Sequence, residues 1–293
     1  MRRCAKSSTS LPLERPLLRP FWLAYAFFAI CLSLSACQNS QSPFVTGPDD
    51  RAVTQFAQGL YLRGQSLDTF AARGVARYRS GAENILYNFE LIAQRPDSYY
   101  CTFFDPLGRP AFRVVNQKGV LRALDYGEKI FYEAKKSDKE VSDLLPIPLT
   151  NRDFLDIFSA SLPYRPALVS QSASLGNDPQ SLISYQADVG SAPVTILVTG
   201  GPAWNIKDAL VLELTRGRVQ NPDYKAQYSS YNFLPLEDEP DKTFPFPGEI
   251  ILSWSSFTQK TLTVTMEEIR LGVSLPQGFF TLEKPQGFTL EKI

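Results

Sequence analysis

The residues that could carry out catalysis in this chain are few and poorly grouped. Histidine is absent from all 293 residues, which excludes Ser-His and Cys-His nucleophile pairs, His metal ligands and imidazole acid–base chemistry. Carboxylates pair at Glu267-Glu268 and run from Glu237 to Asp241, but a solvated strand edge and a solvated loop explain them better than acid–base work. Gly200-Gly201-Pro202 lacks the Lys-Ser/Thr of a phosphate cradle. The sequence therefore predicts no enzyme, no cofactor and no metal site.

One cysteine lies in a pattern with a chemical meaning. A basic N-terminus precedes an apolar run from Phe21 to Leu32, and small residues follow it up to Cys37. These are the three parts of a secretory signal, and the run is shorter than the about 20 apolar residues of a membrane span. Leu34-Ser35-Ala36-Cys37 resembles the lipobox of bacterial lipoproteins, whose cysteine is acylated and becomes the first residue. An ordinary signal peptide with a chance cysteine is the alternative.

The chain divides into three parts. The resemblance implies a lipoprotein signal peptide at 1–36 and acylation at Cys37. The composition of 37–48, rich in Ser, Asn, Gln, Pro and Gly, predicts a flexible tether, and the periodic sequence after it predicts a single folded domain at 49–293. Gln38 stands where Asp would retain a lipoprotein in the inner membrane, so the resemblance favours the periplasmic face of the outer membrane. Equal numbers of basic and acidic residues, 30 each, with a pI near 6.4, argue against a nucleic-acid partner.

The folded domain is mostly strand in its sequence pattern. Asp49 and Asp50 can cap an amphipathic helix that Gly64 stops. After it the hydrophobic period changes from 3.6 to 2, as in Tyr87, Phe89 and Leu91, which predicts half-buried strands. Further β-rich runs cover approximately 68–79, 97–104, 110–116, 119–124, 128–134, 181–189, 193–199, 208–216, 223–233, 248–256 and 260–271.

Shorter segments interrupt these strands. A capping box predicts a helix over 137–145, and Thr150 or Asn151 opens a second helix that Pro163 closes. Residues 165–180 and 234–247 are predicted as loops. In the last strand the apolar parity switches near Glu267-Glu268, which predicts a β-bulge.

About a dozen strands in one series predict a curved antiparallel sheet with helical lids. A sheet of this size curls around something, and aromatic inner faces favour an apolar cavity suited to an acyl chain. The alternative is the same sheet with a solid interior, which would make the protein an envelope scaffold or accessory lipoprotein that works through protein contacts.

Residues 98–108, Ser-Tyr-Tyr-Cys-Thr-Phe-Phe-Asp-Pro-Leu-Gly, resemble the strand and loop of the outer-membrane lipoprotein receptor family called LolB. Lys118 to Leu121, the 137–145 segment, Pro146 to Leu149 and Phe154 to Ile157 continue the match in order. Beyond about residue 165 only the strand pattern agrees, and the chain is longer than typical members.

The resemblance implies a half-open β-barrel of about 11–12 strands under an α-helical lid. It implies a protein that receives lipoproteins, through their acyl chains, from a periplasmic LolA-like carrier and places them in the outer membrane. Leu107, between Pro106 and Gly108, matches the exposed loop leucine that delivers cargo into the membrane in that family. No motif marks the pocket residues. Tucking back into the core is the alternative for Leu107.

Overall fold

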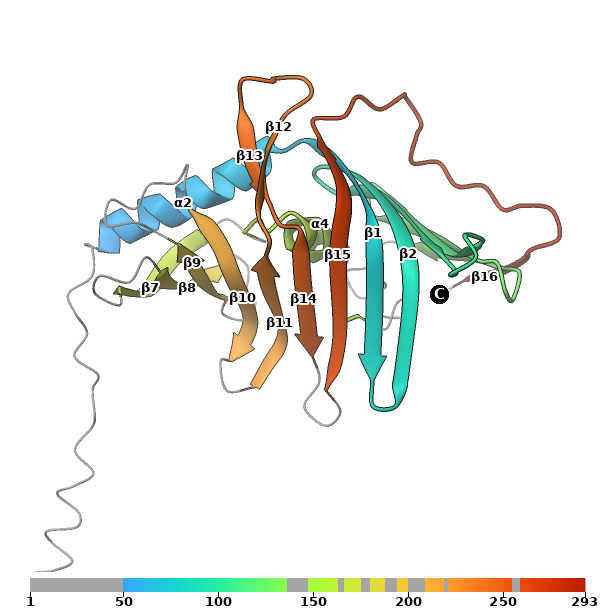
Figure 1. Ribbon diagram of the computed structural model, residues 1–293, viewed down its shortest axis with the longest axis horizontal. Helices are drawn as coiled ribbons and strands as arrows, with labels where there is room; N and C mark the ends of the chain where they lie inside the picture. The colour runs from blue at the N-terminus through green and yellow to red at the C-terminus, as the bar shows by residue number, and fades with distance from the viewer. Residues whose placement is uncertain are drawn as a thin grey trace, which may run out of the picture. The chain divides into compact units, whose positions relative to one another are not determined.

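The computed structural model (Figure 1) describes residues 50–135, 147–162, 166–174, 180–187, 194–199, 209–218, 221–254 and 259–292. All of them belong to one compact unit, Val45–Ile293. The predicted signal peptide at 1–36, the lipidation site Cys37, the tether at 37–48 and the helix at 137–145 lie outside the described residues.

Most of the strands form a single curved sheet of fourteen strands, in the order β16-β6-β5-β4-β3-β2-β1-β15-β14-β11-β10-β9-β8-β7. Neighbours pair antiparallel, except that β16 runs parallel to β6. The bounds are β1 Thr69–Ser80, β2 Glu83–Gln94, β3 Ser98–Phe104, β4 Pro110–Gln117, β5 Val120–Asp125, β6 Ile130–Lys135, β7 Pro166–Ser174, β8 Gln180–Ala187, β9 Val194–Thr199, β10 Leu210–Arg218, β11 Asn221–Ser229, β14 Glu249–Trp254, β15 Lys260–Leu271 and β16 Thr289–Lys292.

The mainly β fold with a large curved sheet confirms the coarse prediction from the sequence. The sheet does not close into a barrel, because β16 and β7 remain its two edges. A separate two-stranded hairpin, β12 Asn232–Pro235 and β13 Thr243–Phe246, lies past the ends of the central strands β11, β14 and β15 (Figure 1).

Alternation of side chains fixes the register of the central strands. In β2, Phe89 and Leu91 are buried on one face while Asn88 is exposed on the other. Between β1 and β15, Gly74 pairs with Met266 and Arg73 with Glu268, which leaves Glu267 as the extra residue of a bulge. The bulge predicted near Glu267-Glu268 is therefore present.

Gly74 has a steric reason to be glycine. A Cβ atom there would lie 1.9 Å from the carbonyl oxygen of Thr265 in the neighbouring strand. The bulge thus depends on a close backbone approach that only glycine permits.

Two predicted loops contain strands. The loop prediction for 165–180 is wrong, because β7 Pro166–Ser174 forms an edge of the sheet. Its sequence, Pro-Ala-Leu-Val-Ser-Gln-Ser-Ala-Ser, has no clean apolar alternation, so the period of two that marks a half-buried strand is missing. The 234–247 loop holds at its ends parts of the short strands β12 and β13.

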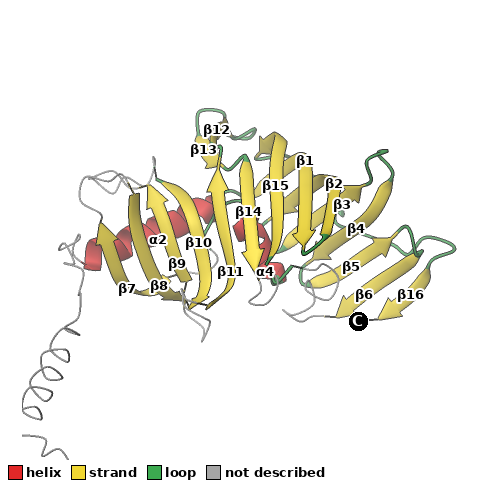
Figure 2. Cartoon of the chain, turned by 60° about the horizontal axis from the view of Figure 1, so that its bottom comes forward, coloured by secondary structure: helices red, strands yellow, loops and turns green. Residues whose placement is uncertain are grey.

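Both described helices lie on the same face of the sheet (Figures 1 and 2). Helix α2 spans Asp50–Ser66 and buries Ala57 and Leu60, one turn apart. Helix α4 spans Asn151–Phe158 and begins at Thr150, whose side chain accepts a hydrogen bond from the backbone N–H of Asp153 at 3.1 Å. Among the described residues, no helix has the length and apolar character to cross a membrane.

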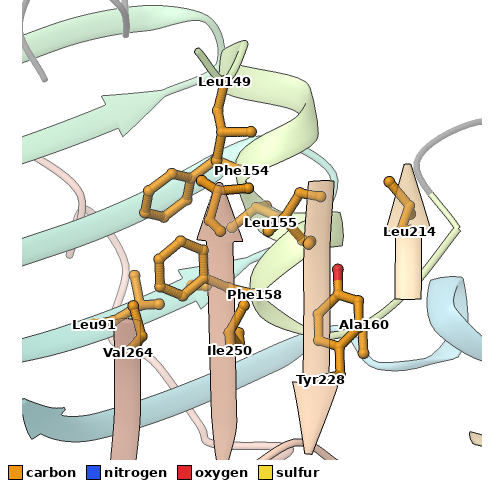
Figure 3. Close-up of a cluster of buried hydrophobic side chains, with 14 of the residues drawn as sticks. Leu91, Leu149, Phe154, Leu155, Phe158, Ala160, Leu214, Tyr228, Ile250 and Val264 are labelled. Carbon is orange, nitrogen blue, oxygen red and sulfur yellow. The ribbon is translucent and has the colours of Figure 1, made fainter. Parts of the chain in front are cut away.

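Helix α4 fills the middle of this face. Figure 3 shows its aromatic side chains above residues from several strands. The Phe154 ring stacks on Tyr99 and on Phe158, with ring centroids 4.4 Å apart in each pair. Below them lie Leu91, Tyr228, Ile250 and Val264, all in the same buried cluster. The middle of the interior is therefore packed with the chain's own side chains.

The C-terminal segment covers part of the opposite face. After β15 the chain places Phe280 and Leu282 against Val115, Leu124 and Phe131, which form a second buried cluster. The segment then ends as β16 beside β6. Residues 272–292, which gave no strand pattern, thus seal the apolar outer surface of β4, β5 and β6.

Candidate functional site

A pocket of about 900 Å³ lies on the helix-bearing face of the sheet, at one end of the strands. That end carries the β1–β2 hairpin, the β3–β4 loop and the β5–β6 turn. The volume falls within the roughly 300–1,000 Å³ typical of ligand pockets. The lining consists mainly of apolar and aromatic residues: Ala76, Tyr78, Ile85, Tyr87, Phe103, Pro110, Ala111, Phe112, Tyr126, Gly127, Ile147 and Leu262, with Glu83, Asp105, Arg109 and Asp125.

Strand register explains why these side chains converge. Tyr78 pairs with Ile85 of β2 and with Leu262 of β15, and Phe103 pairs with Phe112 across β3 and β4. Paired residues share a face, so the five side chains point to the same side as the core. They are only partly buried, because α4 covers the middle of the face and leaves this end open.

The charged residues at the pocket are largely engaged in turns. The Asp105 carboxylate accepts hydrogen bonds from the backbone N–H groups of Leu107 and Arg109, each at 2.9 Å, and from Arg109 Nε at 2.7 Å. The backbone and side-chain hydrogen bonds from Arg109 are the main reason that the pKa of Asp105 is lowered. Asp125 Oδ1 accepts from the backbone N–H groups of Gly127 and Glu128. These carboxylates shape loops and leave apolar binding as the pocket's main chemistry.

The β3–β4 loop holds Leu107 outward at the rim of this pocket. Leu107 is 78% exposed, while its neighbours Asp105, Arg109 and Pro110 line the pocket. The Gly108 N–H donates to the Asp105 carbonyl at 2.8 Å, and Gly108 has a φ of 76°. Together with the ring of Pro106, these bonds restrict the loop and keep Leu107 away from the core.

Two buried ion pairs fix α4 above the sheet. Arg95, in the turn between β2 and β3, binds Asp156 at 2.5 Å and donates to Ser159 Oγ at 2.9 Å. Arg216, from β10 in the other half of the sheet, pairs with Asp153. Helix α4 is thus held from both sides, and Ile147, which precedes it, lines the pocket.

Other candidate chemical groups are unsuitable as sites. Cys101 is buried, and that burial raises the pKa of its thiol. Glu267 and Glu268 are exposed beside the bulge. Within the part of the chain that the structure describes, no group of three or more His, Cys, Asp or Glu side chains could hold a metal ion.

The sequence predicted a membrane-insertion loop at Pro106, Leu107 and Gly108, a role that stays a prediction, and it named no residue of the pocket walls. Leu107, Pro106 and Gly108 were predicted as a unit and form the outer loop. Tyr78, Ile85 and Leu262 were not predicted as pocket residues. The part of the helix-bearing face that stays open depends on where α4 packs. The pattern of apolar residues in the strands does not show where that is.

No protein-family model matches the chain, and no curated protein does. Solved structures do match. The chain is similar to a LolA superfamily protein from Nitrosomonas europaea, with a TM-score of 0.52, 13% identity, and 80% of this chain and 99% of that chain covered. The chain therefore has a LolA-like fold.

Two further structures agree. An outer membrane lipoprotein-sorting protein domain from Vibrio parahaemolyticus gives a TM-score of 0.55 at 10% identity, over 79% of this chain and 97% of that chain. A DUF1329 family protein from Desulfovibrio piger gives 0.53 at 12% identity over the same shares. At such identities the likeness to LolA superfamily structures shows the fold alone, and it does not single out a LolB-type protein.

Proposed function

We propose that this chain is a lipoprotein of the outer membrane, anchored through acylated Cys37, whose pocket receives the acyl chain of another lipoprotein or lipid. The observation that carries the proposal is the apolar pocket of about 900 Å³ beside the exposed Leu107 loop. The LolA-like fold supports it, since a similar domain is named for lipoprotein sorting. The same proposal includes a half-open barrel under a helical lid. It also includes a LolA-like carrier as the donor of the cargo, and insertion of the cargo into the membrane assisted by Leu107.

The energetics suit transfer rather than storage. Burying roughly fourteen methylenes contributes on the order of 11 kcal/mol, at about 0.8 kcal/mol per methylene. A bilayer offers the same chain a similar gain. Because the pocket is open at one end, it buries only part of a long chain, so cargo can both enter and leave.

Binding of a fluorescent fatty-acid probe tests the proposal with a matched pair of variants. Ile85 lines the pocket, and Leu86, next to it on β2, points to the opposite face and is 42% exposed. In the full chain carrying Cys37→Ser, Ile85→Asp should weaken probe binding at least tenfold, because a charge in an apolar site is costly. Leu86→Asp should leave probe affinity unchanged. Absence of binding by the parent chain, or equal effects of the two variants, would overturn the proposal.

The packed centre supports a second candidate, an envelope scaffold that acts through protein contacts. Tyr99, Phe154 and Phe158 occupy the position where a continuous cavity would run. A scaffold would bind no acyl probe, whereas it would still assemble with envelope proteins. The same binding experiment therefore separates the two functions.

A further inference from the structure

We propose that the tip of the β1–β2 hairpin is a docking surface for anionic phospholipid, formed by Arg77, Arg79 and Leu86, which we term the basic tip. It lies at the end of the sheet that carries the pocket and Leu107. The inference rests on the proposed function only in that an acyl-binding pocket must meet a membrane.

The two arginines share the outer face of β1. Arg77 pairs with Leu86 of β2, and Arg79 with Asn84, while both face threonines of β15 on the other side. Residues two apart on a strand are about 7 Å apart, so the two guanidinium groups project from adjacent positions of one surface. Both side chains are exposed, and within the described residues neither forms an ion pair.

Arg73 on the same strand and face behaves differently. Its guanidinium lies 2.8 Å from the Glu90 carboxylate and 3.6 Å from Glu268. Its charge is therefore neutralised within the sheet. The strand partners of Arg77 are Leu86 and Thr263, and those of Arg79 are Asn84 and Thr261, so no partner carries a charge and both guanidinium groups remain available to an external anion.

Apolar side chains accompany these charges. Leu86 and Leu107 are two of the large hydrophobic residues that the structure leaves exposed. Because β3 ends at Phe104, which pairs with Asn88, the Leu107 loop continues alongside the preceding residues of β2. Ile85 and the loop residues Asp105 and Arg109 line the same pocket, which confirms that proximity.

Cations beside exposed leucines match the chemistry of an anionic lipid surface. Guanidinium groups bind headgroup phosphates, while leucine side chains enter the boundary of the acyl region. The basic tip and the pocket lie on opposite faces at the same end of the strands, so a membrane that meets this end edge-on would contact both. A soluble phosphate would use only the arginines, and this difference separates the two sources of phosphate.

Vesicle co-sedimentation of the full chain carrying Cys37→Ser tests the inference without an acyl anchor. Phosphatidylcholine vesicles with and without phosphatidylglycerol provide neutral and anionic surfaces. Each basic residue near an anionic surface strengthens binding about fivefold. Arg77→Gln with Arg79→Gln should therefore weaken binding to the anionic vesicles about 25-fold and barely affect binding to neutral ones. Replacing both with lysine should preserve most of the binding, because the charge is kept.

Arg73→Gln is the matched control and should change vesicle binding by less than twofold. An equal loss in this control, or binding that does not depend on phosphatidylglycerol, would overturn the inference. If inorganic phosphate competes with vesicle binding and Leu86→Asn leaves vesicle binding unchanged, the basic tip is only a site for free anions. That result would also overturn the inference. Probe binding by the Arg77→Gln, Arg79→Gln chain should stay intact. If the parent chain binds anionic vesicles but not the fatty-acid probe, the pocket function is refuted and the docking inference is not.

Discussion

The ion pair between Arg95 and Asp156 gives a sharp prediction about what holds α4 in place. The side chains are 7% and 5% exposed, and Arg95 also donates to Ser159. Asp156→Ala removes the carboxylate and leaves a buried guanidinium without its opposite charge. Breaking a buried pair in this way costs about 3–5 kcal/mol, so the free energy of unfolding should fall by that amount.

A double-mutant cycle isolates the pair itself. The cycle compares Arg95→Met, Asp156→Leu and the variant with both changes; the double variant removes both buried charges and should be much less destabilised than Asp156→Leu alone. The coupling energy should be about 3 kcal/mol. The control is the surface pair of Arg73 with Glu90, in which the Arg73 side chain is 63% exposed. Its coupling energy should not exceed about 1 kcal/mol.

Urea unfolding followed by circular dichroism measures each of these free energies. If Asp156→Ala costs less than about 1 kcal/mol, or the double variant is as unstable as the single one, the pair is not the desolvated contact described above. In that case α4 would be held by its aromatic contacts and by the pair of Arg216 with Asp153.

Four further outcomes follow from the same structure. Leu107→Glu should change the free energy of unfolding by less than about 0.5 kcal/mol, because the side chain is exposed, yet abolish insertion of labelled lipoprotein into vesicles. Burial raises the pKa of Cys101, so its thiol should resist a thiol reagent at pH 8 until urea unfolds the protein. Phe280→Ala should cost about 3–5 kcal/mol in urea unfolding and expose the C-terminal segment to protease. The pKa of Asp105 is lowered, so the stabilising effect of its carboxylate is present above its ordinary pKa and is lost as the pH falls through the lowered pKa. NMR of the carboxyl group can follow this titration. A normal pKa would contradict the loop hydrogen bonds.

Local patterns were sufficient for much of the sheet. The alternation of Phe89 and Leu91 with polar residues reported a strand with one buried face, because a half-buried strand must alternate. The change of parity at Glu267-Glu268 located the bulge for the same reason. Thr150 marked the start of α4 because a side-chain oxygen is needed there to cap free N–H groups.

Long-range packing set the limits of that reasoning. The sequence of β7 does not alternate apolar and polar residues, and all four residues of β16 are exposed, so neither strand carries a periodic signal. Arg95 and Asp156 are distant in sequence, and no pattern in either segment announces a pair. The Leu107 loop was found through a family resemblance, since composition and periodicity do not distinguish an exposed leucine from a buried one.

The extent of the pocket follows from α4 rather than from the size of the sheet. A sheet of fourteen strands could enclose a much longer cavity, but Phe154 and Phe158 block its middle. Within the described residues, a guest chain of the proposed kind would bind at the end that carries Leu107, and it would bury fewer methylenes than a closed cavity would allow. Since each buried methylene contributes about 0.8 kcal/mol, such a pocket cannot hold a long chain against a bilayer. Under the proposed function, the direction of transfer would then be set by which membrane or carrier lies against the open end, and the surface around Leu107 would matter as much as the pocket itself.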